Sequence, residues 1–94
     1  MKPLTEQEIA ALCDREKGWA FRDGKISREW SFRDFVAAMA FVNHVAQVAE
    51  AAGHHPDIDI RYNRVLLGLV THDAGGVTAR DADMAARLNR EFPS

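Results

Sequence analysis

The segment from Ser31 to Ala52 constrains the fold of this 94-residue chain more than any other feature. Its apolar residues recur at spacings of three and four, which predicts one long helix with a buried stripe. Ser31 and Asp34 form a helix-start pattern, and Gly53 is typical of the residue just beyond a helix end. The expected core stripe is Phe32, Phe35, Val36, Met39, Val42 and Ala46, and a second apolar stripe contains Phe41, Val45 and Val48.

A small domain needs to bury only one stripe of such a helix, so the second stripe has two interpretations. It contacts a partner subunit, or the helix lies deep against a sheet that covers both stripes. A chain of this size buries only about two-thirds of the surface that its unfolded form exposes. Cys13 is the only cysteine, which excludes an internal disulfide. We therefore expect self-association to supply additional stability.

Two hairpins and two further helices complete the predicted order of elements. Asp23-Gly24 favours the positive φ angles of a tight turn, and Thr5 with Glu8 and Thr78 with Asp81 match the capping box of helix starts. The predicted elements are a helix at 5–16, strands at 19–22 and 25–30, the long helix at 31–52, strands at 57–62 and 65–71 around a turn at 63–64, and a helix from 78 with Met84, Ala85, Leu88 and Phe92 on its core face. This order indicates an α+β fold, with a four-stranded antiparallel sheet and three helices on one face, in a single domain over residues 1–94.

Charge and hydropathy exclude several functions. Twelve Lys and Arg against 14 Asp and Glu give a net charge of −2, so no strongly basic surface is available for nucleic acid. Uninterrupted apolar runs fall far below the roughly 18 to 20 residues of a membrane span, so we expect no membrane helix. The N-terminus lacks the apolar core of a signal peptide, which together with the unpaired cysteine predicts a cytoplasmic protein. The dispersed arginines Arg22, Arg28, Arg33 and Arg61 are interpreted as solvated charges.

Three of the four histidines lie at predicted element boundaries. His54 and His55 follow the long helix, and His72 follows the last strand. If the second hairpin turns near 63–64, antiparallel pairing brings His72 back beside Pro56, so the histidines should meet in space. Pro56 restricts His55 to an extended backbone, in which neighbouring side chains point to opposite sides. His54 and His55 should therefore flank one substrate rather than bind one atom.

Acid–base chemistry suits these residues best. Imidazole titrates near neutrality and either donates or accepts a proton there. A zinc site is the alternative, since His54, His55, His72 and Asp73 are all acceptable ligands. Adjacent histidines coordinate one ion poorly, however, and no usual zinc-ligand spacing is present. Cys13 has no identifiable activating base, which leaves nucleophilic catalysis without a candidate residue.

Three segments form a combination that is more specific than any one of them. They are Glu50-Ala51-Ala52-Gly53-His54-His55-Pro56-Asp57, then Tyr62-Asn63-Arg64-Val65, and Thr71-His72-Asp73 followed by Gly76, Thr78 and Asp81. Together they resemble the pterin-4a-carbinolamine dehydratase family. The similarity covers most of the chain and includes Gly18-Trp19, the apolar helix and the order of all elements.

The resemblance implies a cofactor-free and metal-free dehydration of 4a-hydroxytetrahydropterin to quinonoid dihydropterin, in tetrahydrobiopterin recycling. It implies that His54, His55 and His72 are catalytic. Asp81, which the pattern alone would assign to a helix surface, matches a supporting acid. The segments that contact the pterin contain the same three histidines together with Pro56, Thr71, Asp73 and Ala74. The implied partners are the pterin substrate, further copies of the chain in a homodimer or homotetramer, and a pterin-dependent aromatic-amino-acid hydroxylase as a metabolic partner.

Two other functions stay open. Members of the family also serve as dimerisation cofactors of a homeodomain transcription factor, so the chain could be a protein-binding module with a vestigial pocket. The presence of both His54 and His72 favours the enzyme, because a binding role would tolerate their loss. A small zinc hydrolase would require stoichiometric metal in the purified protein.

Overall fold

The computed structural model describes residues 1–94, and its order of elements, α-β-β-α-β-β-α, confirms the predicted α+β fold. The helices are α1 (Glu6–Arg15), α2 (Phe35–Ala52) and α3 (Ala79–Glu91), with a short 3₁₀ turn, η1 (His72–Ala74), before α3. The strands are β1 (Ala20–Arg22), β2 (Lys25–Ser31), β3 (Asp57–Arg61) and β4 (Arg64–Leu69).

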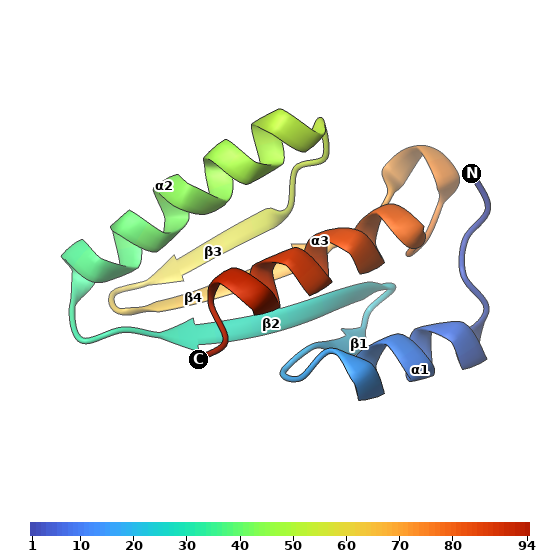
Figure 1. The fold of residues 1–94 in the computed structure, drawn as a ribbon, viewed down its shortest axis with the longest axis horizontal. Helices are drawn as coiled ribbons and strands as arrows, with labels where there is room; N and C mark the ends of the chain where they lie inside the picture. The colour runs from blue at the N-terminus through green and yellow to red at the C-terminus, as the bar shows by residue number, and fades with distance from the viewer.

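All four strands form one antiparallel sheet in the order β1-β2-β4-β3. The two hairpins therefore lie side by side, with β2 and β4 in the centre and β1 and β3 at the edges (Figure 1). In the centre of the sheet, Ile26 lies opposite Leu69. In the second hairpin, Asp57 lies opposite Gly68, so the residues that precede β3 lie close to those that follow β4.

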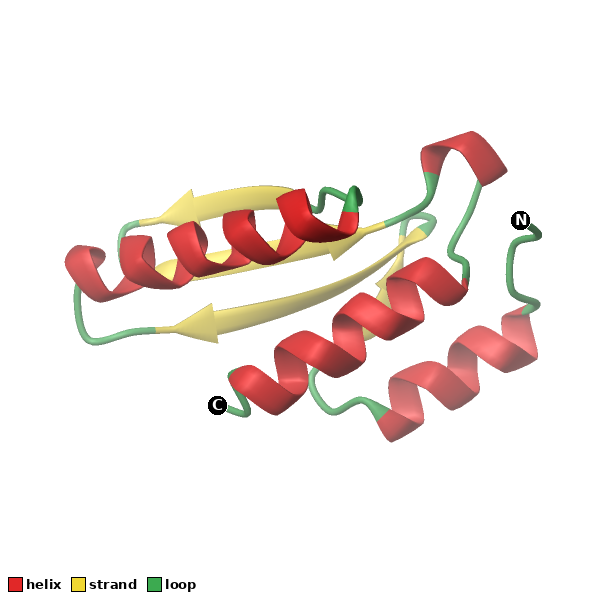
Figure 2. Cartoon of the chain, turned by 45° about the horizontal axis from the view of Figure 1, so that its top comes forward, coloured by secondary structure: helices red, strands yellow, loops and turns green.

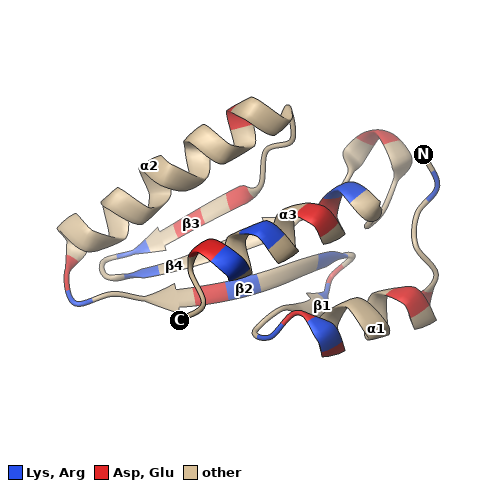
Figure 3. Cartoon of the chain, in the orientation of Figure 1, with Lys and Arg blue, Asp and Glu red and all other residues tan.

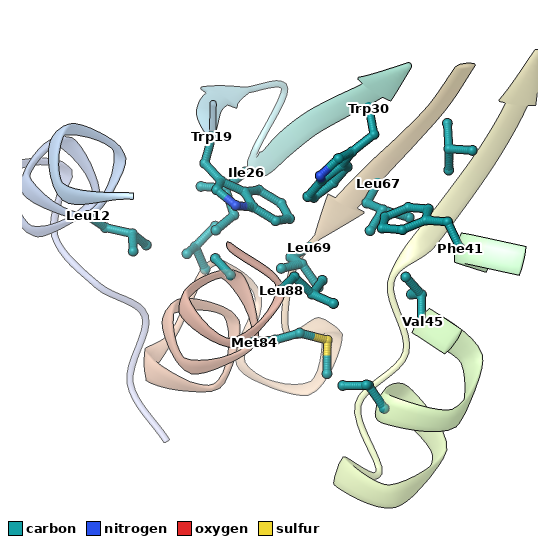
Figure 4. Close-up of a cluster of buried hydrophobic side chains, with 14 of the residues drawn as sticks. Leu12, Trp19, Ile26, Trp30, Phe41, Val45, Leu67, Leu69, Met84 and Leu88 are labelled. Atoms are coloured by element: carbon teal, nitrogen blue, oxygen red, sulfur yellow. The ribbon is translucent and has the colours of Figure 1, made fainter. Parts of the chain in front are cut away.

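The helices pack against one face of this sheet (Figure 2). Alternate residues of the two central strands point to that face and are almost fully buried, because the side chains of a strand alternate between its two faces. The core side chains labelled in Figure 4 come from all three helices, from the sheet and, for Trp19, from the residue just before β1: Leu12, Trp19, Ile26, Trp30, Phe41, Val45, Leu67, Leu69, Met84 and Leu88.

α1 and α3 begin at the predicted capping boxes. At α1, the Thr5 hydroxyl accepts a hydrogen bond from the Glu8 N–H at 3.1 Å, and the Glu8 carboxylate accepts one from the Thr5 N–H at 2.8 Å. At α3, the Thr78 N–H donates to the Asp81 carboxylate at 2.8 Å. Both starts depend on contacts within four residues, which is why the sequence pattern locates them.

α2 begins later than predicted. Its N-cap residue is Asp34, whose carboxylate accepts a hydrogen bond from the Ala37 N–H at 2.8 Å. Ser31 belongs to β2 instead, because it pairs with Arg64 across the centre of the sheet. The end of α2 is as predicted, at Gly53, which has the left-handed φ of 63°.

The stripe of α2 that faces the core is the reverse of the one expected. Phe41 and Val45 are 3% and 0% exposed, whereas Phe35 and Val36 are 49% and 76% exposed. The Phe41 ring lies 4.9 Å from the Trp30 ring of β2, so aromatic packing accompanies this rotation of the helix. The face that carries Phe35 and Val36 is uncovered.

α2 is also long and apolar enough to cross a membrane, by length and composition, and the expectation that no segment meets this test is wrong. Counting only uninterrupted apolar runs underestimates the length of this apolar segment, because isolated polar residues divide it. Glu50 is its only Asp, Glu, Lys or Arg side chain (Figure 3). The core helix of a globular domain passes the same test, and one side of α2 is packed against the sheet here.

The first hairpin turns where the sequence predicted, and the second turns one residue away from its predicted place. The first turns at Asp23-Gly24, with φ angles of 53° and 80°. The second turns at Tyr62-Asn63, one residue earlier than predicted, because β4 begins at Arg64. The Asn63 side-chain amide donates to the Phe32 carbonyl at 2.7 Å and fixes this hairpin tip beside the loop that leads to α2.

Arg28 is buried, contrary to its interpretation as a solvated charge. It is 9% exposed, and its guanidinium carbon lies 4.2 Å from the centre of the Trp30 ring. It donates hydrogen bonds to the Asn89 side chain and, at 2.9 Å, to the Pro93 carbonyl. Burial lowers the pKa of Arg28. The Trp30 indole N–H donates to the Phe92 carbonyl at 3.0 Å, so β2 holds the residues that follow α3.

Candidate active site

A pocket of about 220 Å³ lies where α2 and β4 end and α3 begins. The structure brings His54, His55 and His72 together in its wall, as the hairpin argument predicted. The other lining residues are Gly53, Val70, Thr71, Asp73 and Arg80. Three larger hollows, of about 340 Å³, 450 Å³ and 570 Å³, contain no histidine. The histidine pocket is therefore the candidate active site.

The end of α2 directs the first two histidines into this region. Gly53 takes the left-handed conformation that a residue with a side chain rarely adopts, and the His54 N–H then donates to the Ala49 carbonyl at 3.1 Å. The Arg80 guanidinium donates to the Gly53 carbonyl at 2.9 Å. This contact connects the end of α2 to the first turn of α3.

His54 is held by a buried carboxylate. Its Nε2 lies 2.6 Å from Oδ1 of Asp81, and the two side chains are 9% and 0% exposed. The second oxygen, Oδ2, accepts hydrogen bonds from the Thr71 hydroxyl and from the Thr78 N–H, both at 2.8 Å. Because Oδ2 already faces two donors, Asp81 serves as an ionised acceptor toward His54.

The other ring nitrogen of His54 is the one available to a substrate. With Nε2–H donated to Asp81, a neutral imidazole has its lone pair on Nδ1. Nδ1 makes no hydrogen bond within the protein, and every fully buried side-chain nitrogen or oxygen has a partner. Nδ1 is therefore accessible, and the pocket is where His54 is exposed. In this tautomer His54 can accept a proton at Nδ1.

His55 and His72 are in a different environment from His54, because both are exposed. His55 Nε2 lies 2.9 Å from the Glu50 carboxylate, one turn back on α2. His72 begins η1 and has no side-chain hydrogen bond. Its loop is closed by Thr71 and Gly76, which exchange backbone hydrogen bonds of 3.0 and 3.3 Å. The pocket thus combines one fixed imidazole with two exposed ones.

The remaining predicted residues divide into two groups. Thr71 and Asp73 line the pocket, whereas Pro56 and Ala74 do not. Asp81 lies behind His54 rather than in the wall, and its default assignment to the helix surface is wrong because it is completely buried. The sequence analysis missed Arg80, whose only signal is its place in the capping turn of α3.

The metal-ligating side chains of the structure are not arranged as a metal site. No group of three His, Cys, Asp or Glu residues is arranged so that it could hold a metal ion, and the four residues considered as zinc ligands are no exception. Burial raises the pKa of the Cys13 thiol, which disfavours the reactive thiolate form. The chemistry that this pocket can perform with its own side chains is proton transfer.

Comparison with known proteins shows the family to which the chain belongs. The sequence profile of the pterin 4 alpha carbinolamine dehydratase family matches residues 2–91, and the chain belongs to this family. A relative from Acidobacterium capsulatum is 58% identical over 88 residues, covering 94% of this chain and 96% of the relative. One from Koribacter versatilis is 53% identical over 92 residues, covering 98% of each chain. Both carry the name pterin-4-alpha-carbinolamine dehydratase provisionally.

A solved structure has the same fold. The crystal structure of a transcriptional coactivator/pterin dehydratase from Brucella melitensis superimposes with a TM-score of 0.88, at 38% sequence identity. The match covers 95% of this chain and 97% of the other. The resemblance inferred from the sequence motifs is therefore confirmed at the level of the family.

Proposed function

We propose that this protein dehydrates 4a-hydroxytetrahydropterin to quinonoid dihydropterin by histidine acid–base catalysis. One observation carries the proposal: three histidines line a single pocket, and one of them is fixed by a buried carboxylate. Membership of the dehydratase family supports the same reaction.

The reaction needs two proton transfers. The bond between C4a and the hydroxyl oxygen breaks, its electron pair leaves with the oxygen, and that oxygen takes a proton to become water. The lone pair of a ring nitrogen forms the new double bond, and a ring N–H gives up its proton. One acid and one base therefore suffice, and such positioned groups typically contribute about 10² to 10⁴ in rate.

We assign the base to His54, because its Nε2–H is given to Asp81 and its Nδ1 is free. The acid is then His55 or His72, which are exposed and can exchange protons with water. The segments with Pro56, Thr71, Asp73 and Ala74 would hold the pterin, as the family resemblance implies.

A dehydration assay tests the proposal. Freshly generated 4a-hydroxytetrahydropterin should lose water faster with the protein than without it, and a chelator should leave the rate unchanged. No acceleration over the spontaneous reaction would overturn the proposal. Activity that a chelator removes and zinc restores would replace it with the metal alternative.

We further propose that the protein self-associates through the uncovered stripe of α2, as a homodimer or a homotetramer. Phe35 and Val36 are exposed there, and Met39 lies partly exposed beside them. The edge strands β1 and β3 offer a second way to pair copies. Sedimentation of the wild type at micromolar concentration should show no monomer. The Val36→Glu variant should sediment as a monomer. A wild-type monomer would contradict this.

The same stripe supports the second candidate function, a dimerisation or coactivator module. The name of the Brucella melitensis protein combines both roles. The two functions separate cleanly: His54→Ala should remove dehydratase activity and leave self-association intact. In metabolism, a pterin-dependent aromatic-amino-acid hydroxylase would produce the substrate, and we propose that the protein acts in the cytoplasm.

A further inference from the structure

Two threonine hydroxyls form a buried chain that ends on the Asp81 carboxylate. The Thr71 hydroxyl lies 2.8 Å from Oδ2 of Asp81 and 2.8 Å from the Thr78 hydroxyl. Thr71 and Thr78 are 5% and 0% exposed. Thr71 follows β4 and Thr78 is the N-cap of α3, so the chain connects the two elements that carry the pocket.

The direction of every hydrogen bond in this chain is determined. An ionised carboxylate only accepts, so Thr71 gives its single hydroxyl hydrogen to Asp81. Thr78 must therefore donate to the Thr71 oxygen, and it accepts in turn from the Arg80 N–H at 3.2 Å. All donors point toward Asp81, and Asp81 faces Nε2 of His54.

We propose that Thr71 is a positioning residue: its hydroxyl, oriented by Thr78, holds the Asp81 carboxylate and through it keeps His54 in the tautomer that accepts a proton. This deepens the proposed function and rests on it. It differs from the role that the family resemblance implies for Thr71, which is contact with the pterin. The only hydrogen of the Thr71 hydroxyl is already donated inside the protein, so it is not available to a substrate.

The physical consequence is a shift in the balance between two protonation states. When His54 is neutral, the negative charge of Asp81 depends on its hydrogen-bond donors alone. When His54 carries an extra proton, that positive charge also stabilises the carboxylate. Removing the Thr71 donor therefore destabilises the state with neutral His54 more than the state with protonated His54. As a result, the His54–Asp81 pair retains its extra proton to a higher pH.

The experiment compares Thr71→Val, Thr71→Ser and the wild type over the full pH range of dehydration. Thr71→Val should move the acidic limb of the kcat profile upward by about half a pH unit or more, the scale of one hydrogen bond to a carboxylate. KM should stay within about twofold, since uniform substrate binding is untouched. Thr71→Ser, which keeps the hydroxyl, should restore the wild-type limb.

Thr5→Val is the matched control, because Thr5 is also a threonine at a capping box but lies at the start of α1. It should leave the limb in place even if it lowers stability. Thr78→Val should shift the limb in the same direction but less, because Thr71 can still donate without it. This second variant keeps the test available if Thr71→Val does not fold.

A raised KM with an unmoved limb in Thr71→Val would overturn the inference and assign Thr71 to pterin contact. Nitrogen NMR of histidine-labelled protein, recorded without substrate, tests the inference about Thr71 independently of whether the protein is a dehydratase. It should find His54 protonated at Nε2 in the wild type and titrating at higher pH in Thr71→Val. An identical His54 titration in the two proteins would overturn the inference, whether or not the wild type is a dehydratase.

Discussion

Two histidine–carboxylate pairs connect α2 to α3, and they have the same length but different surroundings. His54 and Asp81 lie 2.6 Å apart near the start of α3, and His44 and Glu91 lie 2.6 Å apart at its end. The first pair is 9% and 0% exposed, and the second is 45% and 31% exposed. In the first pair the protein supplies every hydrogen bond to the carboxylate, whereas in the second water competes for each charge. A distance alone therefore does not indicate how much a pair contributes.

Removal of the carboxylate should give the largest difference between the two pairs. Asp81→Ala should lower the free energy of unfolding by about 3 kcal/mol or more, because it leaves the buried His54, Thr71 and Thr78 groups without their acceptor. Glu91→Ala should give no resolvable change, since its partners are solvated. Urea unfolding of both variants at neutral pH measures this. Equal losses would show that burial does not distinguish the pairs.

Replacement of the histidine should separate the pairs in catalysis. His54→Ala should lower kcat by roughly 10² or more, the usual scale for a positioned acid or base, and His72→Ala should do the same if it is the acid. His44→Ala should retain wild-type kcat, because its ring contacts Glu91 and Phe92 outside the pocket. Circular dichroism verifies that each variant is folded. Near-wild-type turnover in His54→Ala would refute its assignment as the base.

Changing the pH should alter kcat less than replacing a histidine of the pocket does. If one imidazole accepts a proton while another donates one, the profile is a bell whose limbs lie within a few units of neutrality. The limbs belong to a coupled set of histidines, so only the variants assign them. The spontaneous reaction has to be subtracted at each pH. A corrected profile that is flat from about pH 5 to about pH 9 would exclude a titrating histidine from the rate-limiting step.

The exposed pair should have the smallest effect, which appears in how the stability declines as the solution becomes acidic. Hydrogen bonds from Arg87 and then from His44 lower the pKa of Glu91. A carboxyl group with a lowered pKa contributes stability above its unfolded-state pKa and loses it as the pH falls through the folded-state value. Glu91→Gln should therefore flatten slightly the decline in the urea midpoint between about pH 5 and about pH 3. A steeper decline in the variant would contradict the sign of this shift.

Local patterns predicted the parts of the fold that depend on neighbouring residues. The capping boxes at Thr5 and Thr78, the Asp23-Gly24 turn and the end of α2 at Gly53 are all where the sequence indicated. The convergence of the three histidines was also predictable, because it depends only on the backbone pairing of the second hairpin and not on side-chain packing. A turn displaced by one residue was not enough to separate them.

Features that depend on distant residues were not predictable in this way. Both stripes of α2 are apolar, and what distinguishes them is contact of Phe41 with Trp30, a residue of another element. Arg28 is buried because Asn89 and Pro93 provide acceptors more than 60 positions later. Asp81 has the same pattern as a surface capping residue, and its burial depends on partners distant in sequence, His54 and Thr71.

The attachment of β2 to the residues after α3 has a consequence for folding during synthesis. The Trp30 indole and the Arg28 guanidinium bond to carbonyls that lie 62 and 65 positions further along the chain. A nascent chain on the ribosome can form the first hairpin early, but these two side chains stay without their acceptors until Phe92 and Pro93 have left the exit tunnel. Because contacts of long sequence separation form late and slowly, the aromatic core is complete only after Phe92 and Pro93 have emerged. Pausing of translation before Phe92 would therefore leave a Trp30-containing apolar surface open to other chains.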